Sequence, residues 1–323
     1  MPQLQFSGLT CERHGGESVL DALLRAGAAV SHSCKVGSCG SCLLKTAQVD
    51  RLPAKSQAGL KDAWKASGYF LACSCYPDGD LTAVPVGAEA RSRAQVAGVE
   101  RLTPSVLRVH LRCDDEAFTY RAGQYLTLFR EDGLARSYSI ASLPGEPIEL
   151  HVRRIAGGRM SGWFAAPEAL GATVQIQGPS GECSYIGGRE DQPMLLAGTG
   201  TGLAPLYGVL RDALRAGHRG PVHLYHGALN DAGLYLQDEL RAIAAAHANV
   251  QYLPTTLDGT GPIDAVVRAR HASTAGHRVF LCGDPAIVSG LRKKLFLAGA
   301  ALNDIHADAF TPSAPSASPP AAP

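Results

Sequence analysis

Four cysteines stand at a spacing that suits an iron–sulfur cluster. Cys34, Cys39 and Cys42 follow a C-x4-C-x2-C pattern interleaved with Gly and Ser, and Cys73 lies further on, after the apolar run Tyr69-Phe70-Leu71-Ala72. Thiolates are good ligands for iron, and this spacing is typical of a [2Fe–2S] cluster. The glycines let the backbone turn tightly and direct N–H groups at the cluster sulfurs. The pattern therefore predicts a one-electron carrier bound by these four thiolates.

A structural zinc site is the alternative interpretation of these cysteines. Cys39 and Cys42 form a C-x-x-C pair, but zinc sites usually combine two such pairs. The second pair here would be Cys73 and Cys75, whose one-residue gap is unsuitable. Iron–sulfur binding is therefore favoured. Cys73 is preferred to Cys75 as the fourth ligand because it directly follows a segment that is typical of a strand.

The elements around the cysteines suit a cluster-binding domain. Apolar residues at 19–24 recur at helical spacing after Ser18, a residue type that favours helix N-caps, and Gly27 stands where a left-handed turn would end the helix. From about residue 3 to 86 the chain resembles plant-type ferredoxins, in which a helix leads into the cluster loop. Lys35 stands where that family often has Arg, which preserves the charge. The resemblance implies a β-grasp-like ferredoxin domain.

A second motif, Arg136-Ser137-Tyr138-Ser139, has the residue types that bind a phosphate and a flat ring. Side chains alternate along a strand, so Arg136 and Tyr138 share one face. Arginine binds phosphate through charge-assisted hydrogen bonds, and a tyrosine ring stacks on a heterocycle. Ser139 can reach the edge of such a ring. Standing alone, the motif would be read as an accidental match on a surface strand.

Two glycine turns follow this motif in order. A strand at 151–154 leads to Gly157-Gly158, which opens a short helix, and Gly178-Pro179-Ser180-Gly181 closes the segment. A glycine turn at a helix N-terminus is a ready anion site. The set resembles the flavin domain of the ferredoxin-NADP reductase superfamily, an antiparallel β-barrel. The resemblance implies that Tyr138 stacks on the isoalloxazine, that Ser139 lies near its reactive N5, and that the turn holds the flavin pyrophosphate. The implied flavin ligands are Arg136, Tyr138, Ser139, His151, Arg153, Gly158, Arg159, Met160 and Ser161.

A third motif, Gly198-Thr199-Gly200-Thr201-Gly202, stands between a buried strand at 193–197 and a helix of period 3.6 from 203 to 214. Strand, glycine turn and helix form the dinucleotide-binding arrangement, because the glycines let a pyrophosphate approach the backbone and the helix N-terminus stabilises its charge. Pro205 replaces the last glycine of the usual fingerprint, as in the ferredoxin reductase version. The alternation of strands and helices after about residue 191 predicts a Rossmann-like parallel α/β domain.

The run Cys282-Gly283-Asp284-Pro285 ends a late strand, and Pro285 suits the first position of the next helix. By resemblance to the Cys-Gly-x-Pro motif of the superfamily, Cys282 lies near the contact of nicotinamide with flavin, with Gly283, Asp284 and Pro285 beside it. A buried structural cysteine is the alternative. We favour the functional reading because such folds bind ligands at the carboxyl ends of their strands. Tyr138, Ser139 and Cys282 are thus the candidate catalytic residues.

The choice of nucleotide rests on the segment after the strand at 222–227. It contains Asp231 and no Lys or Arg that would meet a 2′-phosphate, whereas Asp231 can accept from the ribose hydroxyl. NADH is therefore predicted. In a terminal strand at 306–310, Phe310 either covers the flavin face opposite Tyr138, as the superfamily allows, or is a core aromatic.

Length and composition bound the remaining possibilities. The chain has 323 residues, 46% hydrophobic content and a net charge of +1, so it can bury ordinary cores and has no charge excess for nucleic acid or membrane surfaces. No run of spanning length and no signal peptide occurs, which predicts a cytoplasmic protein, taken to be a monomer. The predicted domains are ferredoxin at 1–88, flavin at 96–188 and nucleotide at 190–311, with a Pro/Ala/Ser-rich disordered tail at 312–323.

The ordered motifs together resemble the NADH-dependent, ferredoxin-fused reductases of bacterial multicomponent oxygenases. FAD is predicted rather than FMN, because the FMN-containing relatives usually carry the ferredoxin at the C-terminus. Electrons would pass from NADH to FAD, then to the [2Fe–2S] cluster and to a terminal oxygenase. Two alternatives stay open: the same electron path with another acceptor (a deoxysugar dehydratase or a diiron monooxygenase), or a non-enzymatic redox-sensing or zinc-scaffold protein.

Overall fold

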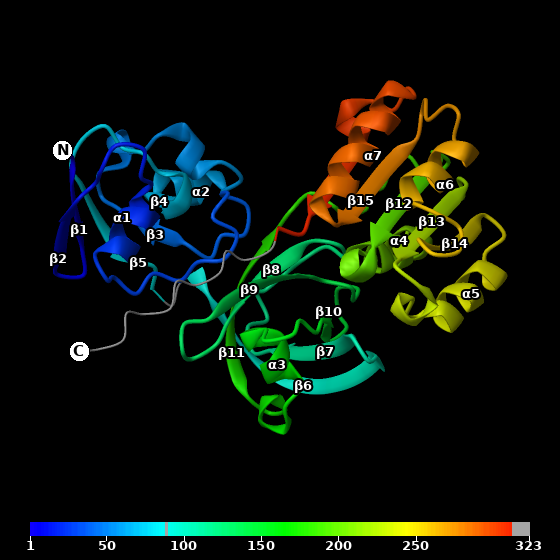
Figure 1. The fold of residues 1–323 in the computed structure, drawn as a ribbon, viewed down its shortest axis with the longest axis horizontal. Helices are drawn as coiled ribbons and strands as arrows, with labels where there is room; N and C mark the ends of the chain where they lie inside the picture. Colours follow the sequence, from blue (N-terminus) through cyan, green and yellow to red (C-terminus); the bar gives the residue numbers. More distant parts are fainter. Residues whose placement is uncertain (88–89, 312–323) are drawn as a thin grey trace.

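The computed structural model describes residues 1–87 and 90–311, which form three domains, each on its own sheet (Figure 1). In Figure 1 the N-terminal domain is blue to cyan, the central barrel is cyan to green, and the C-terminal domain is green to red. The predicted boundary at residue 88 and the predicted tail at 312–323 lie outside the described residues. Among the described residues, no helix is long and apolar enough to cross a membrane.

The N-terminal domain packs one main helix on a mixed sheet. Its elements are β1 (Gln3–Phe6), β2 (Leu9–Glu12), α1 (Val19–Arg25), β3 (Leu43–Lys45), α2 (Asp62–Ala66), β4 (Tyr69–Leu71) and β5 (Leu81–Pro85). The strand order is β2-β1-β5-β3-β4, with β1 and β5 parallel. Helix α1 buries Val19, Leu20 and Leu23 completely, and the Oγ of Ser18 accepts from Asp21 N at 3.1 Å. The predicted helix and its cap are confirmed.

The central domain is an antiparallel barrel of six strands. They are β6 (Ser92–Thr103), β7 (Val106–Cys113), β8 (Tyr125–Phe129), β9 (Ala135–Ser139), β10 (Ile148–Arg153) and β11 (Thr173–Ser180), with one short helix, α3 (Arg159–Phe164). The order β10-β7-β6-β11-β8-β9 closes through a bridge between Ile140 and Leu150, both fully buried. Closure leaves no free sheet edge and fills the interior with alternate side chains.

The C-terminal domain is a five-stranded parallel sheet with order β14-β13-β12-β15-β16. Its elements are β12 (Met194–Thr199), α4 (Leu203–Arg215), β13 (Val222–Ala228), α5 (Gln237–Ala246), β14 (Val250–Thr256), α6 (Ile263–Arg270), β15 (Arg278–Gly283), α7 (Pro285–Leu297) and β16 (Ile305–Ala309). The chain runs outward from β12 to β14 and then returns to β15 on the other side of β12. The strand order therefore reverses between β12 and β15, where such sheets bind ligands.

Candidate functional site

The four predicted cluster ligands lie together in the N-terminal domain, three in the loop before β3 and Cys73 just after β4. They form two pairs, since the thiols of Cys34 and Cys39 interact directly and so do those of Cys42 and Cys73. A [2Fe–2S] cluster needs two thiolates on each of two irons. Among the described residues, no three His, Cys, Asp or Glu side chains converge as a single-ion zinc site requires. The donor set fits the two-iron cluster.

The loop directs hydrogen-bond donors at the first sulfur. The amides of Val36 and Cys39 lie 3.5 and 3.4 Å from Cys34 Sγ, and Ser38 Oγ lies 3.4 Å from it. Hydrogen bonding from Cys39 and from these groups holds the pKa of Cys34 well below its usual range despite burial. Iron binding requires the thiolate, so the loop favours the ionised ligand. Gly37 makes the turn possible: its φ is +80°, and a Cβ there would lie 2.3 Å from Ser74 Oγ.

Cys75 differs from the four paired cysteines. It is completely buried in the core of the domain, where its thiol faces the Ser56 hydroxyl. Burial raises its pKa to about 12, although the Ser56 hydrogen bond acts in the opposite direction. A protonated core thiol behaves as a small hydrophobe. These observations support Cys73 as the fourth ligand.

Strand β9 presents the predicted flavin residues on one edge of the barrel. The guanidinium of Arg136 is half-buried, and in the described chain no carboxylate pairs with it. The Tyr138 ring is half-buried and makes an edge contact with Phe164, with ring centroids 6.0 Å apart. An unpaired, partly desolvated arginine beside an aromatic face suits a phosphate and a planar ring. This part of the barrel fits a flavin.

The glycine turn before α3 lines an open cavity of ≈ 470 Å³. Gly157, Gly158 and Gly162 lie on its wall. Gly158 is required sterically, because a Cβ there would lie 2.6 Å from Ser161 Oγ. Ser161 in turn closes the turn, since its Oγ accepts from Ile155 N at 3.1 Å. The turn thus exposes backbone to the cavity, as a pyrophosphate site requires.

Two residues predicted to bind the flavin, Arg159 and Met160, have their side chains occupied by protein contacts. Met160 is 2% exposed and packs in the barrel core. Arg159 pairs with Asp132, Nη2 to Oδ2 at 2.9 Å. Only the backbone of Met160 remains free for a ligand, and Arg159 must exchange its carboxylate partner to reach a phosphate. Arg153, by contrast, is exposed at the end of β10. The flavin role of these residues stays a prediction.

His151 lies in the interface between the barrel and the C-terminal domain. Its ring is fully buried, donates from Nε2 to Glu149 at 2.8 Å and accepts at Nδ1 from the Tyr235 hydroxyl at 3.1 Å. Burial lowers the pKa of His151, although Glu149 raises it, so the ring is neutral at pH 7. The side chain of His151 therefore joins two domains. Only the backbone of His151 in β10 is free to contact a flavin.

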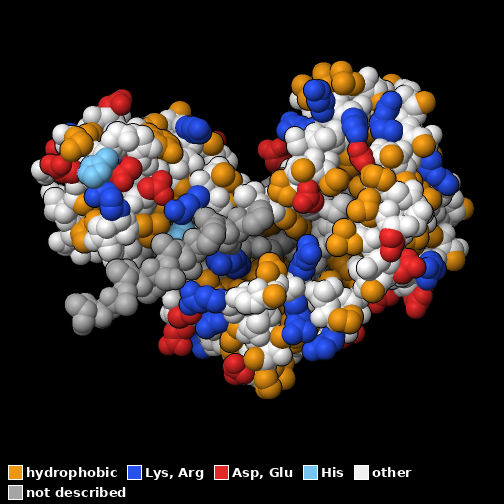
Figure 2. Space-filling view, viewed as in Figure 1, with side chains coloured by type: hydrophobic (Ala, Val, Ile, Leu, Met, Phe, Trp, Pro, Cys, Tyr) orange, Lys and Arg blue, Asp and Glu red, His pale blue; other side chains and the backbone are white. Residues whose placement is uncertain are grey.

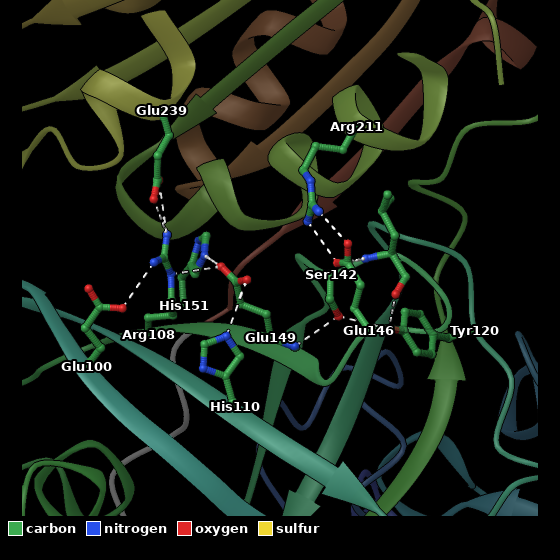
Figure 3. Close-up of polar contacts among 11 residues, drawn as sticks. Glu100, Arg108, His110, Tyr120, Ser142, Glu146, Glu149, His151, Arg211 and Glu239 are labelled. Carbon is green, nitrogen blue, oxygen red and sulfur yellow. Dashed lines mark hydrogen bonds and ion pairs between the residues drawn. The ribbon is translucent and has the colours of Figure 1, made fainter. Parts of the chain in front are cut away.

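Charged side chains complete this interface (Figure 3). Arg108 of β7 contacts Glu239 of α5 at 2.9 Å, and Arg211 of α4 contacts Glu146 at 2.6 Å. Arg108 also pairs with Glu149 at 3.1 Å. Burial raises the pKa of Glu149, but hydrogen bonding from His151 and the nearby positive charges lower it further, to about 2. The Glu149 carboxylate thus stays ionised and holds Arg108 and His151, the barrel residues that contact Glu239 and Tyr235 of the nucleotide domain.

The predicted nucleotide turn follows β12 as a single 3-10 turn, Gly200–Gly202, that leads directly into α4. A Cβ on Gly202 would lie 2.3 Å from the carbonyl oxygen of Cys282, and one on Gly283 would lie 2.5 Å from Thr199 Oγ1. The glycines therefore allow the turns after β12 and β15 to pack against each other. Thr199 Oγ1 also accepts from Asp284 N at 3.0 Å. The predicted glycine turn after β12 and the predicted Cys282 motif after β15 thus meet where the strand order reverses. Thr201 lies in the 3-10 turn that leads into α4.

The Cys282 motif combines a buried thiol with a helix start. Cys282 is 1% exposed at the end of β15, and its Sγ lies 3.3 Å from Cys183 Sγ. Burial raises the pKa of Cys282 well above its usual value, so the thiol is protonated. Asp284 caps α7 by accepting from Ala286 N at 2.9 Å, and Pro285 occupies the first turn. Asp284 and Pro285 thus shape the loop, whereas Cys282 marks the carboxyl end of the strand beside β12.

Asp308 is a candidate functional residue that the sequence reasoning missed. It lies opposite Cys282 in the β15–β16 ladder, and the Ser139 hydroxyl acts as a hydrogen-bond donor to its carboxyl. Burial raises the pKa of Asp308 to about 6, although Ser139 lowers it. A carboxyl that titrates near neutrality beside a predicted flavin contact is suited to proton transfer. The sequence contains only a weak indication of this role for Asp308, namely an acidic residue two positions before Phe310 on the same strand face.

Phe310 and Asp231 lie just beyond the carboxyl ends of β16 and β13. Phe310 is partly exposed just after β16, where its N donates to Gly283 O at 2.8 Å. Asp231 is exposed and opens a short 3-10 turn beyond the carboxyl end of β13. Both residues lie along the edge at which the parallel sheet binds ligands. Neither position by itself shows contact with a cofactor, so both roles stay predictions.

Three family descriptions match successive parts of the chain. Residues 3–78 match the 2Fe-2S iron-sulfur cluster binding domain, residues 94–185 the oxidoreductase FAD-binding domain, and residues 195–293 the oxidoreductase NAD-binding domain. The reductase component of the naphthalene 1,2-dioxygenase system from Pseudomonas putida is 32% identical, over 92% of this chain and 94% of that protein. The chain belongs to the ferredoxin–NAD(P)+ reductase components of oxygenase systems.

Other relatives agree with this reductase assignment. The aromatic O-demethylase reductase subunit from Amycolatopsis sp. is 35% identical over 92% of this reductase and 95% of that protein. A solved structure, the Amycolatopsis cytochrome P450 reductase GcoB, superposes with a TM-score of 0.68 at 30% identity, covering 97% of this chain and 99% of that one. The ferredoxin reductase of carbazole 1,9a-dioxygenase superposes with a TM-score of 0.62 at 26% identity, over 96% and 98%.

The predicted cofactors and fold class are confirmed for the reductase by these matches. It is an oxidoreductase that passes electrons from a nicotinamide nucleotide through FAD to a [2Fe–2S] cluster. FAD, when bound, accepts an electron pair and releases the electrons singly. The chain itself would hold and align the groups: we expect the paired cysteines to hold the irons, and the turns after β12 and β15 to present backbone to the nucleotide. The zinc-scaffold alternative finds no support among the relatives.

Proposed function

We propose that the reductase delivers its electrons to the terminal oxygenase component of a multicomponent oxygenase that acts on an aromatic substrate. The observation that carries this proposal is similarity along nearly the whole chain to reductases of naphthalene and terephthalate dioxygenase systems, at 32% identity each. The cluster loop also presents Val36, 63% exposed, at the protein surface, which gives a partner access near the cysteines. Acidic and basic side chains are interspersed over the face in Figure 2, so no single strong field covers that face.

A cytochrome P450 is the second candidate acceptor. The relatives from Amycolatopsis, an aromatic O-demethylase subunit at 35% identity and a P450 reductase with a TM-score of 0.68, favour it. A diiron monooxygenase is less favoured, because the phenol hydroxylase and propane monooxygenase relatives are only 27% and 28% identical. The deoxysugar dehydratase alternative has no support among these relatives.

Turnover with purified oxygenase components distinguishes these acceptors. The reductase, loaded with FAD and cluster, would be mixed with NADH and with an aromatic-ring dioxygenase, a P450 or a diiron hydroxylase, and product would be measured. We expect the dioxygenase component to give the highest kcat/KM for the reductase. Product from the P450 alone would replace the first proposal by the second. Cluster reduction without product from any component would leave the electron path intact and exclude these oxygenase classes.

We also propose that NADH is the physiological donor. Asp231 lies beyond β13, and no Lys or Arg occurs in the chain between there and Arg241. A 2′-phosphate would meet a negative charge without a cation, so we expect kcat/KM for NADH to exceed that for NADPH by about tenfold or more. Steady-state reduction of ferricyanide with each nucleotide measures this ratio. The Asp231→Asn variant is the matched control and should lower the ratio of kcat/KM for NADH to kcat/KM for NADPH. Equal activity with NADPH would contradict the proposal.

A further inference from the structure

The cluster loop is hydrogen-bonded to the flavin barrel through its own backbone carbonyls. Thr127 donates its hydroxyl to Cys39 O, Gln177 Nε2 donates to Gly40 O at 3.0 Å, and Tyr125 donates its hydroxyl to Ser38 O. We call Tyr125, Thr127 and Gln177 the carbonyl clamp. Three donors on the neighbouring strands β8 and β11 thus bind three consecutive carbonyls of a loop that contains a cluster ligand.

Two of the three clamp residues are buried, and Tyr125 is partly exposed. Thr127 is 2% exposed and Gln177 is 7% exposed. Ser137 Oγ lies 2.9 Å from Thr127 Oγ1, so its hydroxyl can donate to Thr127 while Thr127 donates to the loop. A buried donor that loses its acceptor costs about 1–3 kcal/mol, which makes separation of the two surfaces unfavourable. The contact is therefore a specific interface between domains.

The loop is shaped for this close approach. Gly40 has φ +72°, a conformation that favours glycine, and a Cβ there would lie 3.3 Å from Gln177 Nε2. Any side chain at residue 40 would press on the clamp. Gly40 thus allows both the tight turn of the cluster loop and the close contact of this loop with the barrel.

The clamp also lies beside the flavin motif. Ser137, which supports Thr127, stands between Arg136 and Tyr138 on β9. The Cys39 thiol lies close enough to Arg136 to influence its ionisation, and Tyr125 lies within electrostatic range of both Cys39 and Asp308. The contact therefore joins the two cofactor sites by a short route.

We propose that Tyr125, Thr127 and Gln177 are positioning residues that hold the cluster within electron-transfer range of the flavin, and that Ser38, Cys39 and Gly40 form the electron-entry face of the cluster loop. In the step that they serve, one electron leaves reduced flavin and reduces one ferric ion to ferrous, and no bond forms or breaks. The inference rests on the electron path of the proposed function but not on the identity of the acceptor.

The double variant Thr127→Val/Gln177→Leu tests the clamp. Under anaerobic stopped flow, NADH should reduce the flavin at the wild-type rate, whereas reduction of the cluster should slow by tenfold or more. Hydrogen exchange of the peptide at 35–44, measured without NADH, should rise because the loop no longer docks. Thr173→Val and Gln175→Leu, the same changes at exposed positions of β11, are matched controls and should leave both readouts unchanged.

Unchanged cluster reduction together with unchanged exchange in the double variant would overturn the proposal. If the double variant loses its cluster or flavin absorption, Tyr125→Phe decides, because it removes one donor and keeps the ring. Slower cluster reduction with normal spectra then supports the clamp, and a wild-type rate overturns it. If NADH fails to reduce the cluster even in the wild-type protein, the electron path itself is wrong, and hydrogen exchange still judges whether the clamp docks the loop.

Discussion

Cys73→Ser is expected to abolish the cluster and, with it, electron delivery to a one-electron acceptor protein. Cys73 shares a pair with Cys42, and one iron would lose half of its protein ligands. Visible absorption of the cluster should disappear, and NADH-dependent reduction of cytochrome c should fall by about a hundredfold. Ferricyanide, which accepts directly from flavin, should still be reduced at close to the wild-type rate. Absorption spectra and the two assays measure this split.

Cys75→Ser is the matched control for that result. Cys75 is completely buried beside Ser56, outside the two thiol pairs, so the cluster spectrum should persist. A hydroxyl in an apolar core costs about 1–3 kcal/mol, so a lower Tm is expected with normal colour. A colourless Cys75→Ser protein and a coloured Cys73→Ser protein would reverse the ligand assignment.

Asp308→Asn is expected to slow turnover and to remove a pH dependence. The carboxyl faces Ser139, and its pKa of about 6 lets it exchange a proton near neutrality. General acid–base groups contribute about a hundredfold or more, so we expect turnover with ferricyanide to fall by ten- to a hundredfold. The limb of the wild-type pH profile near pH 6 should disappear. Stopped-flow flavin reduction and steady-state pH profiles measure both effects.

Asp308→Asn is expected to increase stability at pH 8, although it lowers turnover. The pKa of Asp308 is raised from 3.8 to about 6 on folding, so its contribution to stability is fully present below pH 3.8 and is lost as the pH rises through 6. At pH 8 the wild-type protein is thereby penalised by at most about 3 kcal/mol relative to Asp308→Asn. The variant should therefore have the higher Tm at pH 8, and the advantage should shrink at pH 4.5.

Asp308→Glu provides the control for both effects. It keeps a carboxyl near Ser139 and should restore part of the activity and the pH dependence. Full activity and an unchanged pH profile in Asp308→Asn would show that Asp308 is structural. A lower Tm at pH 8 in that variant would show that the carboxylate is stabilising there, against the raised pKa.

Features that depend on a few neighbouring residues were predictable. The cap at Ser18, the glycine turn before α4 and the proline at the start of α7 are local, because each satisfies or omits backbone hydrogen bonds within one helical turn. The three ordered motifs likewise predicted a barrel followed by a parallel sheet, and the observed sheets have that form.

Side-chain roles between domains were not predictable in the same way. The sequence placed His151 in a strand but did not show that its partner is Tyr235, which is 84 residues away. Met160 stands in a recognisable motif, yet its side chain fills the barrel core. Asp308 has an unremarkable sequence context. The β15–β16 register brings it to Cys282, and the packing of the parallel sheet against the barrel brings it to Ser139.

The chemistry of this reductase was thus determined by its sequence, and the connection between the chemical sites by its tertiary structure. Thiolate spacing, an Arg-x-Tyr-Ser strand and a glycine turn name their cofactors because each ligand set is assembled largely within one segment. The clamp from Thr127 to Cys39 joins residues 88 positions apart, and that from Gln177 to Gly40 joins residues 137 apart. Such contacts depend on how three separately packed cores meet, and no local pattern of residues encodes that geometry.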